Sequence, residues 1–142
     1  MIDNDLIQAG IVAKLKADTT LISYLATFSA GAEVREAEYQ SREFVYPNVR
    51  VELGTQIEEG DPPCYSLIPL TIYSYSETDS SQQVNHLAGL VNAALLRKQF
   101  TGTGFRSGLI ISDGNIAGRR TTERVWQAVN QYRCNIYGGN FD

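Results

Sequence analysis

Residues 64–76 read CYSLIPLTIYSYS, and residues 76–100 read SETDSSQQVNHLAGLVNAALLRKQF. The first stretch is rich in β-branched and aromatic residues, which is typical of a strand. The second stretch has apolar residues at helical spacing, which predicts a helix over residues 80–98. A strand that leads directly into a long helix indicates an α+β domain in which the helix covers a sheet. No cluster of catalytic residue types accompanies these two segments.

The predicted strand and helix each carry a local signal. Ile68 and Leu70 flank Pro69, which cannot donate a ladder hydrogen bond, so we expect this strand at a sheet edge, or Pro69 at a bulge. Ser80 and Gln83 have the spacing of a capping box at the start of the helix. Gly102 and Gly104 are expected to end the helix. The stripe expected to be buried consists of Val84, Leu87, Leu90, Val91, Ala94 and Leu95.

Two further helical segments are predicted near the N-terminus. Residues 3–18 have helical spacing, with Asp3 or Asn4 as the cap. A second short helix restarts at Asp18 or Thr19. The two segments form either a helical hairpin or one kinked helix.

The rest of the chain predicts strands. A short strand is expected to begin at Val34. Residues 48–53 alternate as a half-buried strand with one wet face. Asp113 and Gly114 lie between apolar residues and predict a tight hairpin turn. Residues 126–137 form a long final strand in the centre of the sheet. The predicted fold is one α+β domain over residues 1–142, with a mainly antiparallel or mixed β-sheet flanked by an N-terminal helix and one long helix.

Composition narrows the class of protein. The chain has 142 residues and a formal net charge of -4, which argues against broad nucleic-acid binding. An acidic pore through which nucleic acid passes without sticking remains compatible with that charge. The N-terminus lacks a basic region and a long apolar core, so we expect no signal peptide. No apolar run approaches the roughly 18–20 residues that span a bilayer, so we expect no membrane partner.

Few residues suggest chemistry. His86 is the only histidine and falls on the polar side of the predicted helix, so we interpret it as a surface residue. Cys64 and Cys134 are far apart and make no zinc motif; a disulfide needs neighbouring strands. We therefore expect no catalytic residue, no cofactor and no metal site.

Two charged segments are candidates for an interface. The acidic group consists of Glu58, Glu59 and Asp61. The second group consists of Arg119, Arg120, Glu123 and Arg124. Each is either a solvated turn or a contact surface, and arginine is enriched at protein contacts.

The order of motifs resembles one known family. The helical stretch LIQAGIVAKLKADTTLISYL precedes FVYPNVRVELG, and LTIYSYSE then runs into QQVNHLAGLVNAALL before the closing WQAVNQYRCNIY. This order, over roughly residues 3–138, resembles the tail-completion or tail-terminator proteins of long-tailed bacteriophages. The segment GLIISDGNIAGRRTTERV is longer than the family pattern.

The resemblance implies a structural virion protein that is not an enzyme. It implies a homo-hexameric ring that caps the tail tube and offers the surface for head joining. The implied partners are further copies of the chain, the tail tube protein, head-tail connector proteins and genome DNA that passes through the lumen without specific binding. The implied location is the tail or neck of a virion, assembled in the host cytoplasm.

Two alternatives remain open from the sequence. One is another neck, connector or baseplate module of a virion. The other is a small α+β ligand-binding domain or enzyme, which needs a pocket with convergent polar groups.

Overall fold

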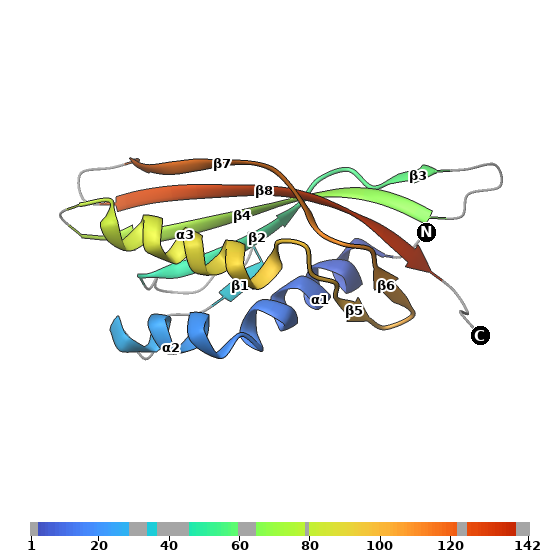
Figure 1. The fold of residues 1–142 in the computed structure, drawn as a ribbon, viewed down its shortest axis with the longest axis horizontal. Helices are drawn as coiled ribbons and strands as arrows, with labels where there is room; N and C mark the ends of the chain where they lie inside the picture. Colours follow the sequence, from blue (N-terminus) through green and yellow to red (C-terminus); the bar gives the residue numbers. More distant parts are fainter. Residues whose placement is uncertain are drawn as a thin grey trace.

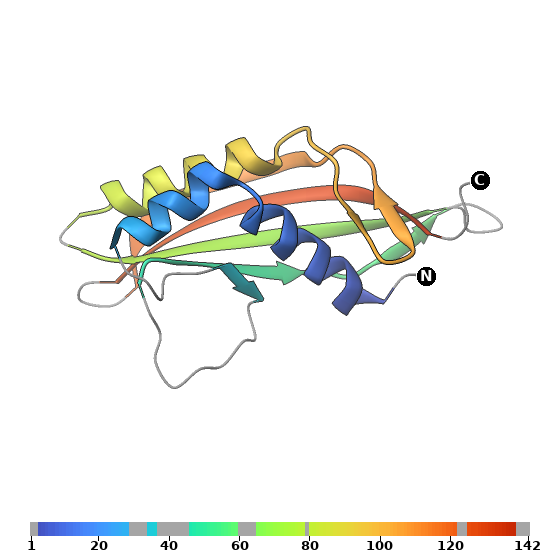
Figure 2. The ribbon, with the colours of Figure 1, turned by 90° about the horizontal axis from the view of Figure 1, so that it is seen from below.

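A computed structural model describes residues 3–28, 34–36, 46–59, 65–78, 80–121 and 125–138. Three helices cover one face of an eight-stranded sheet, as Figures 1 and 2 show. The helices are α1 (Asn4–Lys16), α2 (Thr19–Phe28) and α3 (Gln82–Leu95). The strands are β1 (Val34–Glu36), β2 (Asn48–Leu53), β3 (Ile57–Glu59), β4 (Tyr65–Glu77), β5 (Thr101–Gly102), β6 (Phe105–Ser107), β7 (Ile111–Arg120) and β8 (Val125–Gly138).

The sheet is mixed, and its main order is β1-β2-β4-β8-β6-β5. Strand β1 runs parallel to β2, and every other pairing is antiparallel. Strand β3 pairs with β4, and β7 pairs with β8. This arrangement confirms the predicted α+β class and the central place of the last strand.

The core lies between the sheet and the helices. Alternate residues of β4 and β8 point into it, including Ile68, Leu70, Tyr132 and Ile136, all of which are buried. Leu87 lies on the buried stripe of α3, with no exposed surface. Five of the six residues in the predicted stripe are buried, and the sixth, Leu90, is half-buried and packs against the core.

Helices α1 and α2 run end to end with a bend between them, so the kinked arrangement holds and the hairpin does not (Figures 1 and 2). The carboxylate of Asp18 accepts a hydrogen bond from the backbone N–H of Leu21 at 2.9 Å. This bond caps α2, because a side-chain oxygen satisfies one of the free donors of the first turn.

Strand β4 is central, so its predicted place at an edge is wrong. Its neighbours are β2 and β3 on one side and β8 on the other. Pro69 is tolerated because it lies where β2 has ended and β3 has not begun. There the carbonyl of Pro69 accepts a hydrogen bond from Gly54 at 2.8 Å, and its missing N–H faces the same gap.

The expected wet face of β2 is also partly wrong. Asn48 and Arg50 are 0% and 4% exposed, respectively. Each stands in register with a tyrosine of β4, Tyr75 beside Asn48 and Tyr73 beside Arg50. These large neighbours account for the burial of short or flexible polar side chains on that face.

Asp113 and Gly114 do not form a hairpin turn. Strand β7 runs through them, and its register against β8 shifts between Ser112 and Gly114. Gly114 has φ +117°, which a residue without a Cβ adopts without strain. The pair therefore forms a β-bulge, which has the same composition as a tight turn.

The long helix is shorter than predicted. Ser81, and not Ser80, is the N-cap of α3, and the Ser81 side chain makes no capping bond, so the capping box is wrong. The hydroxyl of Ser80 instead accepts a long hydrogen bond from the N–H of Gln82 at 3.4 Å. The helix ends at Leu95, and Gly102 belongs to β5 rather than to a helix stop. The chain turns instead at Arg97, whose N–H donates to the carbonyl of Ile110 at 2.7 Å.

Candidate interaction surfaces

The acidic segment lies at one end of the sheet. Glu58 is exposed on β3 and stands opposite Ser66 of β4. Glu59 belongs to the same strand, but its side chain is not among those described, and Asp61 lies outside the described residues. Glu58 and Glu59 thus lie on a short strand rather than in a loop.

The basic segment lies at the other end. Arg119 and Arg120 are exposed at the end of β7, opposite Gln127 and Trp126 of β8. Glu123 and Arg124 lie outside the described residues. The structure therefore places the two arginines on a strand end.

The acidic and basic segments do not meet within one molecule. In the sheet register, Glu58 lies opposite Ser66 of β4. Arg119 lies opposite Gln127 of β8, which in turn lies opposite Tyr75 of β4. Nine residues of strand separate these positions, or roughly 30 Å at about 3.3 Å per residue. The two segments also lie on opposite sides of the β4–β8 pair (Figure 1). Any pairing between them must join two different molecules.

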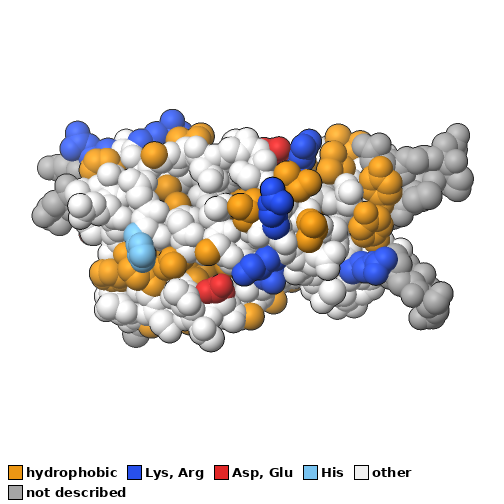
Figure 3. Space-filling model, in the orientation of Figure 1, with side chains coloured by type: hydrophobic (Ala, Val, Ile, Leu, Met, Phe, Trp, Pro, Cys, Tyr) orange, Lys and Arg blue, Asp and Glu red, His pale blue; other side chains and the backbone are white. Residues whose placement is uncertain are grey.

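The face that carries β7 is rich in basic side chains. Figure 3 looks onto it and shows several Lys and Arg side chains but little acidic surface. Arg133 of β8 pairs with Asp113 of β7 at 3.4 Å, and both side chains are about half exposed to water. Such an exposed pair contributes about 0–1 kcal/mol, so it orients side chains more than it stabilises the fold.

An apolar hollow that the sequence did not reveal lies on the same face. Its volume is about 450 Å³, and its lining consists of Leu96, Arg97, Leu109, Ile111 and Ser112. Leu109 is 54% exposed and Ile111 is 50% exposed. The apolar run 109–111 is the sequence signal for this hollow, but the same run also fits the flank of a hairpin.

A second hollow of about 270 Å³ lies between α3 and β7. Its lining consists of Asn85, Ala88, Gly89, Asn92, Asn115, Ile116, Ala117 and Asn130. The N–H of Gly118 donates to the side-chain oxygen of Asn85 at 2.6 Å and holds β7 beside the helix. We call this hollow the α3–β7 groove.

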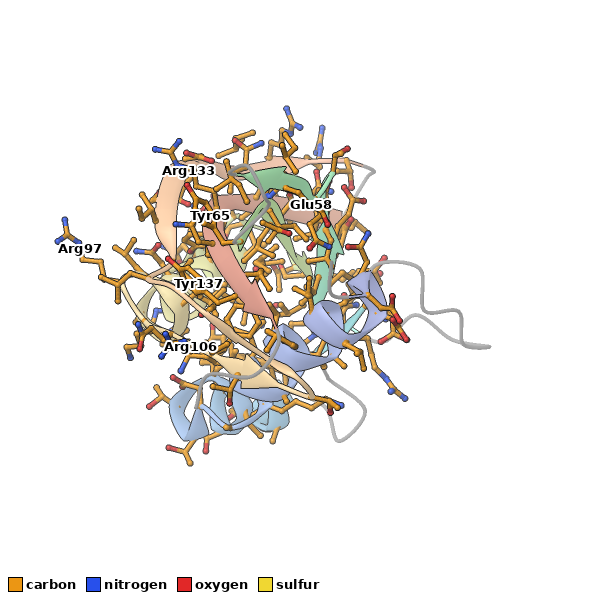
Figure 4. All side chains as sticks on the ribbon, turned by 90° about the vertical axis from the view of Figure 1, so that its right-hand side faces the viewer. Glu58, Tyr65, Arg97, Arg106, Arg133 and Tyr137 are labelled. Atoms are coloured by element: carbon orange, nitrogen blue, oxygen red, sulfur yellow. The ribbon has the colours of Figure 1, made fainter. Side chains whose placement is uncertain are left out.

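An aromatic row crosses the end of the sheet near β3. The rings of Tyr65 and Tyr137 lie 5.8 Å apart, and the guanidinium of Arg106 lies 5.7 Å from the Tyr137 ring centre. Figure 4 shows these side chains in a line from β4 through β8 to β6. Tyrosine and arginine are common at protein contacts, so this row is a further candidate surface.

The described residues offer little catalytic chemistry. Across the ranges given above, no group of three or more His, Cys, Asp or Glu side chains could hold a metal ion. His86 is exposed, and its ring lies 4.7 Å from the ring of Tyr24 on α2. No described helix is long and apolar enough to cross a membrane.

Burial shifts two ionisable groups of β8. It raises the pKa of the Cys134 thiol to about 12. It also raises the pKa of Tyr132, against a smaller lowering effect of the hydrogen bond with Asn130. Cys134 is a free thiol, and Cys64 lies outside the described residues. Both shifted groups are core residues rather than parts of an open site.

Comparison with known proteins adds the fold of a virion component. No protein-family model matches the sequence, and no curated protein matches it either. A solved chain described as "Virion of native gene transfer agent (GTA) particle" matches with a TM-score of 0.73 and 16% sequence identity. The match covers 94% of this chain and 96% of that chain. The two chains therefore share a fold over nearly their whole length.

Proposed function

We propose that the chain is a structural virion protein that acts as a tail terminator. In this role it forms a ring on the tail tube, and we expect the ring to be a hexamer. The observation that carries this proposal is the shared fold with a virion chain over 94% and 96% of the two lengths. The order of sequence motifs described above points to the same class. The chain acts by contact and not by catalysis.

The distribution of charge supports a ring subunit. Contacts around a ring are heterologous, so each subunit needs two different and complementary surfaces. Glu58 and the Arg119–Arg120 pair lie at opposite ends of the sheet, on strands that flank the β4–β8 pair on its two sides. Besides its own copies, the proposed partners of the chain are the tail tube protein, head-tail connector proteins and DNA that passes through the lumen of the ring.

A second position in the virion is also compatible with the shared fold. The description of the matching chain names a whole virion and no position within it. A connector or baseplate module is therefore the alternative function, and the same experiment separates the two.

The experiment removes the gene from a strain that produces the particle and measures tails by negative-stain electron microscopy. A terminator predicts tails of excess and variable length that lack heads, and a plasmid copy of the chain restores normal length. Tails of normal length that fail to join heads indicate a connector, and loss of tails indicates a baseplate component. Normal particles after deletion contradict a virion role altogether.

A ring also has a direct physical signature. Six copies of a 15.7 kDa chain give a mass of about 94 kDa in native mass spectrometry. Negative-stain images of the same sample are expected to show a closed ring with a central hole. Open filaments would instead indicate a heterologous contact that does not close.

A further inference from the structure

Two strands of the sheet border open surface on opposite sides of the molecule. Strand β3 pairs with β4, on the side that β2 also occupies, and β7 pairs with β8 on the far side. Among the described strands, neither β3 nor β7 has a second strand partner. An unpaired edge is available to another chain unless local features block it.

Local features of β7 exclude the addition of a long strand. Its register shifts twice, between Ser112 and Gly114 and again between Ile116 and Arg119. The N–H of Gly118 is already occupied by Asn85. Bulges and edge arginines are devices that prevent indiscriminate strand pairing. A partner on this edge must therefore be held by side chains.

The α3–β7 groove provides a place for one such side chain. Ile116 borders the groove and is 40% exposed. Gly89 forms part of the helix wall, and a Cβ at that position would meet open space. The groove is thus lined by four asparagine side chains, by the small residues Ala88, Gly89 and Ala117, and by the exposed aliphatic side chain of Ile116.

The floor of the groove holds an unmet acceptor. Asn130 is 1% exposed, and its Nδ2 donates to the carbonyl of Ala88 and to the hydroxyl of Tyr132. Its Oδ1 has no hydrogen-bond partner among the residues described. A buried acceptor without a donor costs about 1–3 kcal/mol, and an aliphatic side chain cannot remove that cost, whereas a backbone N–H of a docked segment could.

The opposite edge carries an exposed aliphatic side chain and the opposite charge. Ile57 of β3 is 53% exposed and is followed directly by Glu58. Residues 52–61 contain four acidic residues and no basic residue. Residues 96–121, which include β7, contain five basic residues and one acidic residue. That segment carries +4 in a chain of net charge -4, so the rest of the chain carries -8.

We propose that the β3 edge of one copy docks on the β7 edge of the next copy, with Ile57 in the α3–β7 groove beside Ile116. The direction of the contact follows from charge. When the two segments run in the same direction, the acids that follow Ile57 approach Arg119 and Arg120. In the opposite direction they approach Asp113, which is already paired with Arg133, so that direction lacks the attraction of the two arginines. This inference rests on the proposed ring role, because the occupant is a second copy of the chain.

A charge-swap experiment on the purified full chain tests the contact. The first variant carries Arg119→Glu and Arg120→Glu, and the second carries Glu58→Lys and Glu59→Lys. Each variant alone faces like charges across the contact, and we expect its association to weaken at least about tenfold. A 1:1 mixture restores opposite charges at every contact and is expected to form rings in which the two variants alternate.

Alternation also tests the number of copies. A ring of alternating variants closes only with an even number of subunits, so native mass spectrometry should find three of each in a hexamer. The matched control is Lys14→Glu with Lys16→Glu on α1, which changes the net charge by the same amount as the first variant and should assemble normally. Thermal unfolding followed by circular dichroism verifies that every variant is folded.

The groove is tested independently of charge. Gly89→Trp fills the groove from its open wall, and we expect it to abolish assembly of a folded chain. Gly89→Ala is the control and should assemble like the wild type. A wild-type chain that stays monomeric, charge-reversed variants that assemble normally, or a mixture of folded variants that fails to assemble would each overturn this contact.

These outcomes are separable from failure of the proposed function. If gene deletion gives overgrown tails but the reversed variants complete normal tails, the chain is a terminator and its subunits meet elsewhere. If deletion leaves tails unchanged while the charge swap restores rings, the contact is correct and the terminator role is wrong.

Discussion

The hydroxyl of Tyr132 on β8 donates a hydrogen bond to Oδ1 of Asn92 on α3 across 2.8 Å. The same hydroxyl accepts a bond from Nδ2 of Asn130 at 2.9 Å. Tyr132 is 1% exposed, so this network crosses an otherwise apolar layer. It fixes where α3 lies over the central strand, and with it the helix wall of the α3–β7 groove.

Removal of that hydroxyl should destabilise the protein. Tyr132→Phe removes the donor of Asn92 Oδ1, which is half-buried, and we expect the loss of this hydrogen bond to lower the free energy of unfolding by about 0.5–1.5 kcal/mol. Urea denaturation measures the change. The control is Tyr73→Phe, because the Tyr73 hydroxyl lies 3.3 Å from the Glu52 carboxylate on an exposed face and its loss should cost under about 0.5 kcal/mol. Equal losses for the two variants would contradict a structural role for the network.

The same residue predicts a dependence of stability on alkaline pH. Burial raises the pKa of Tyr132 in the folded chain above its ordinary value of 10.0. The folded state then holds its proton more tightly than the unfolded state, so this contribution is full below pH 10 and is lost as pH rises through the folded pKa. Unfolding free energies measured from pH 8 upward should fall above about pH 10, and less steeply in Tyr132→Phe. An identical slope in both proteins would exclude this origin.

Gly54 should tolerate no side chain. A Cβ there would collide with the ring of Pro69, whose carbonyl accepts the hydrogen bond of Gly54. Because the proline ring is rigid and lies in the central strand β4, we expect Gly54→Ala to cost about 1–3 kcal/mol. The control is Gly89→Ala, in a helix and facing open space, which should stabilise the chain by about 0.5–1 kcal/mol. Thermal unfolding of both variants checks the opposite signs.

Cys134 should be inert in the folded protein. Its side chain is 2% exposed, and burial raises its thiol pKa to about 12, so almost no thiolate exists at neutral pH. In a Cys64→Ser background, a thiol reagent at pH 8 should label Cys134 only after denaturant is added. Rapid labelling without denaturant would mean that β8 opens locally.

The sequence predicted those parts of the fold in which one face is buried. Ile68, Leu70 and Ile72 alternate with less buried residues. This period of two identifies a strand even when the strands that pair with it are unknown. Strand β7 is mostly exposed and therefore has no such pattern. Its Asp113-Gly114 pair suits a hairpin and a bulge equally, and only the pairing with β8 decides between them.

The sequence predicts which charged residues could form an interface, but it does not predict where they lie in the fold. Glu58 and Arg119 stand out in sequence, yet their opposite locations follow from which sides of β4 and β8 their strands join. The α3–β7 groove depends on a contact between Asn85 and Gly118, which are 33 residues apart. A groove made by such distant segments leaves no local pattern in the sequence.

Arg97 adopts a left-handed backbone conformation, with φ +59°. This conformation costs a residue with a Cβ roughly 1–2 kcal/mol, which exceeds the roughly 0.5–1 kcal/mol of extra chain entropy that glycine loses on folding. Arg97→Gly should therefore raise the free energy of unfolding by up to about 1 kcal/mol.

The position of the Arg97 side chain gives no reason to expect that its removal destabilises the fold. Figure 4 shows it pointing away from the molecule beside the apolar hollow. Lys98→Gly is the matched control: Lys98 is exposed next to Arg97, and among the described residues Arg97 alone is a non-glycine with positive φ. The control should lose about 0.5–1 kcal/mol, because glycine only adds entropy to the unfolded chain. Urea denaturation of the two variants decides the matter, since equal destabilisation would show that the turn at Arg97 stores no strain. A gain for Arg97→Gly would show that the chain keeps an arginine at a position where its backbone favours glycine, as expected where the side chain serves a contact.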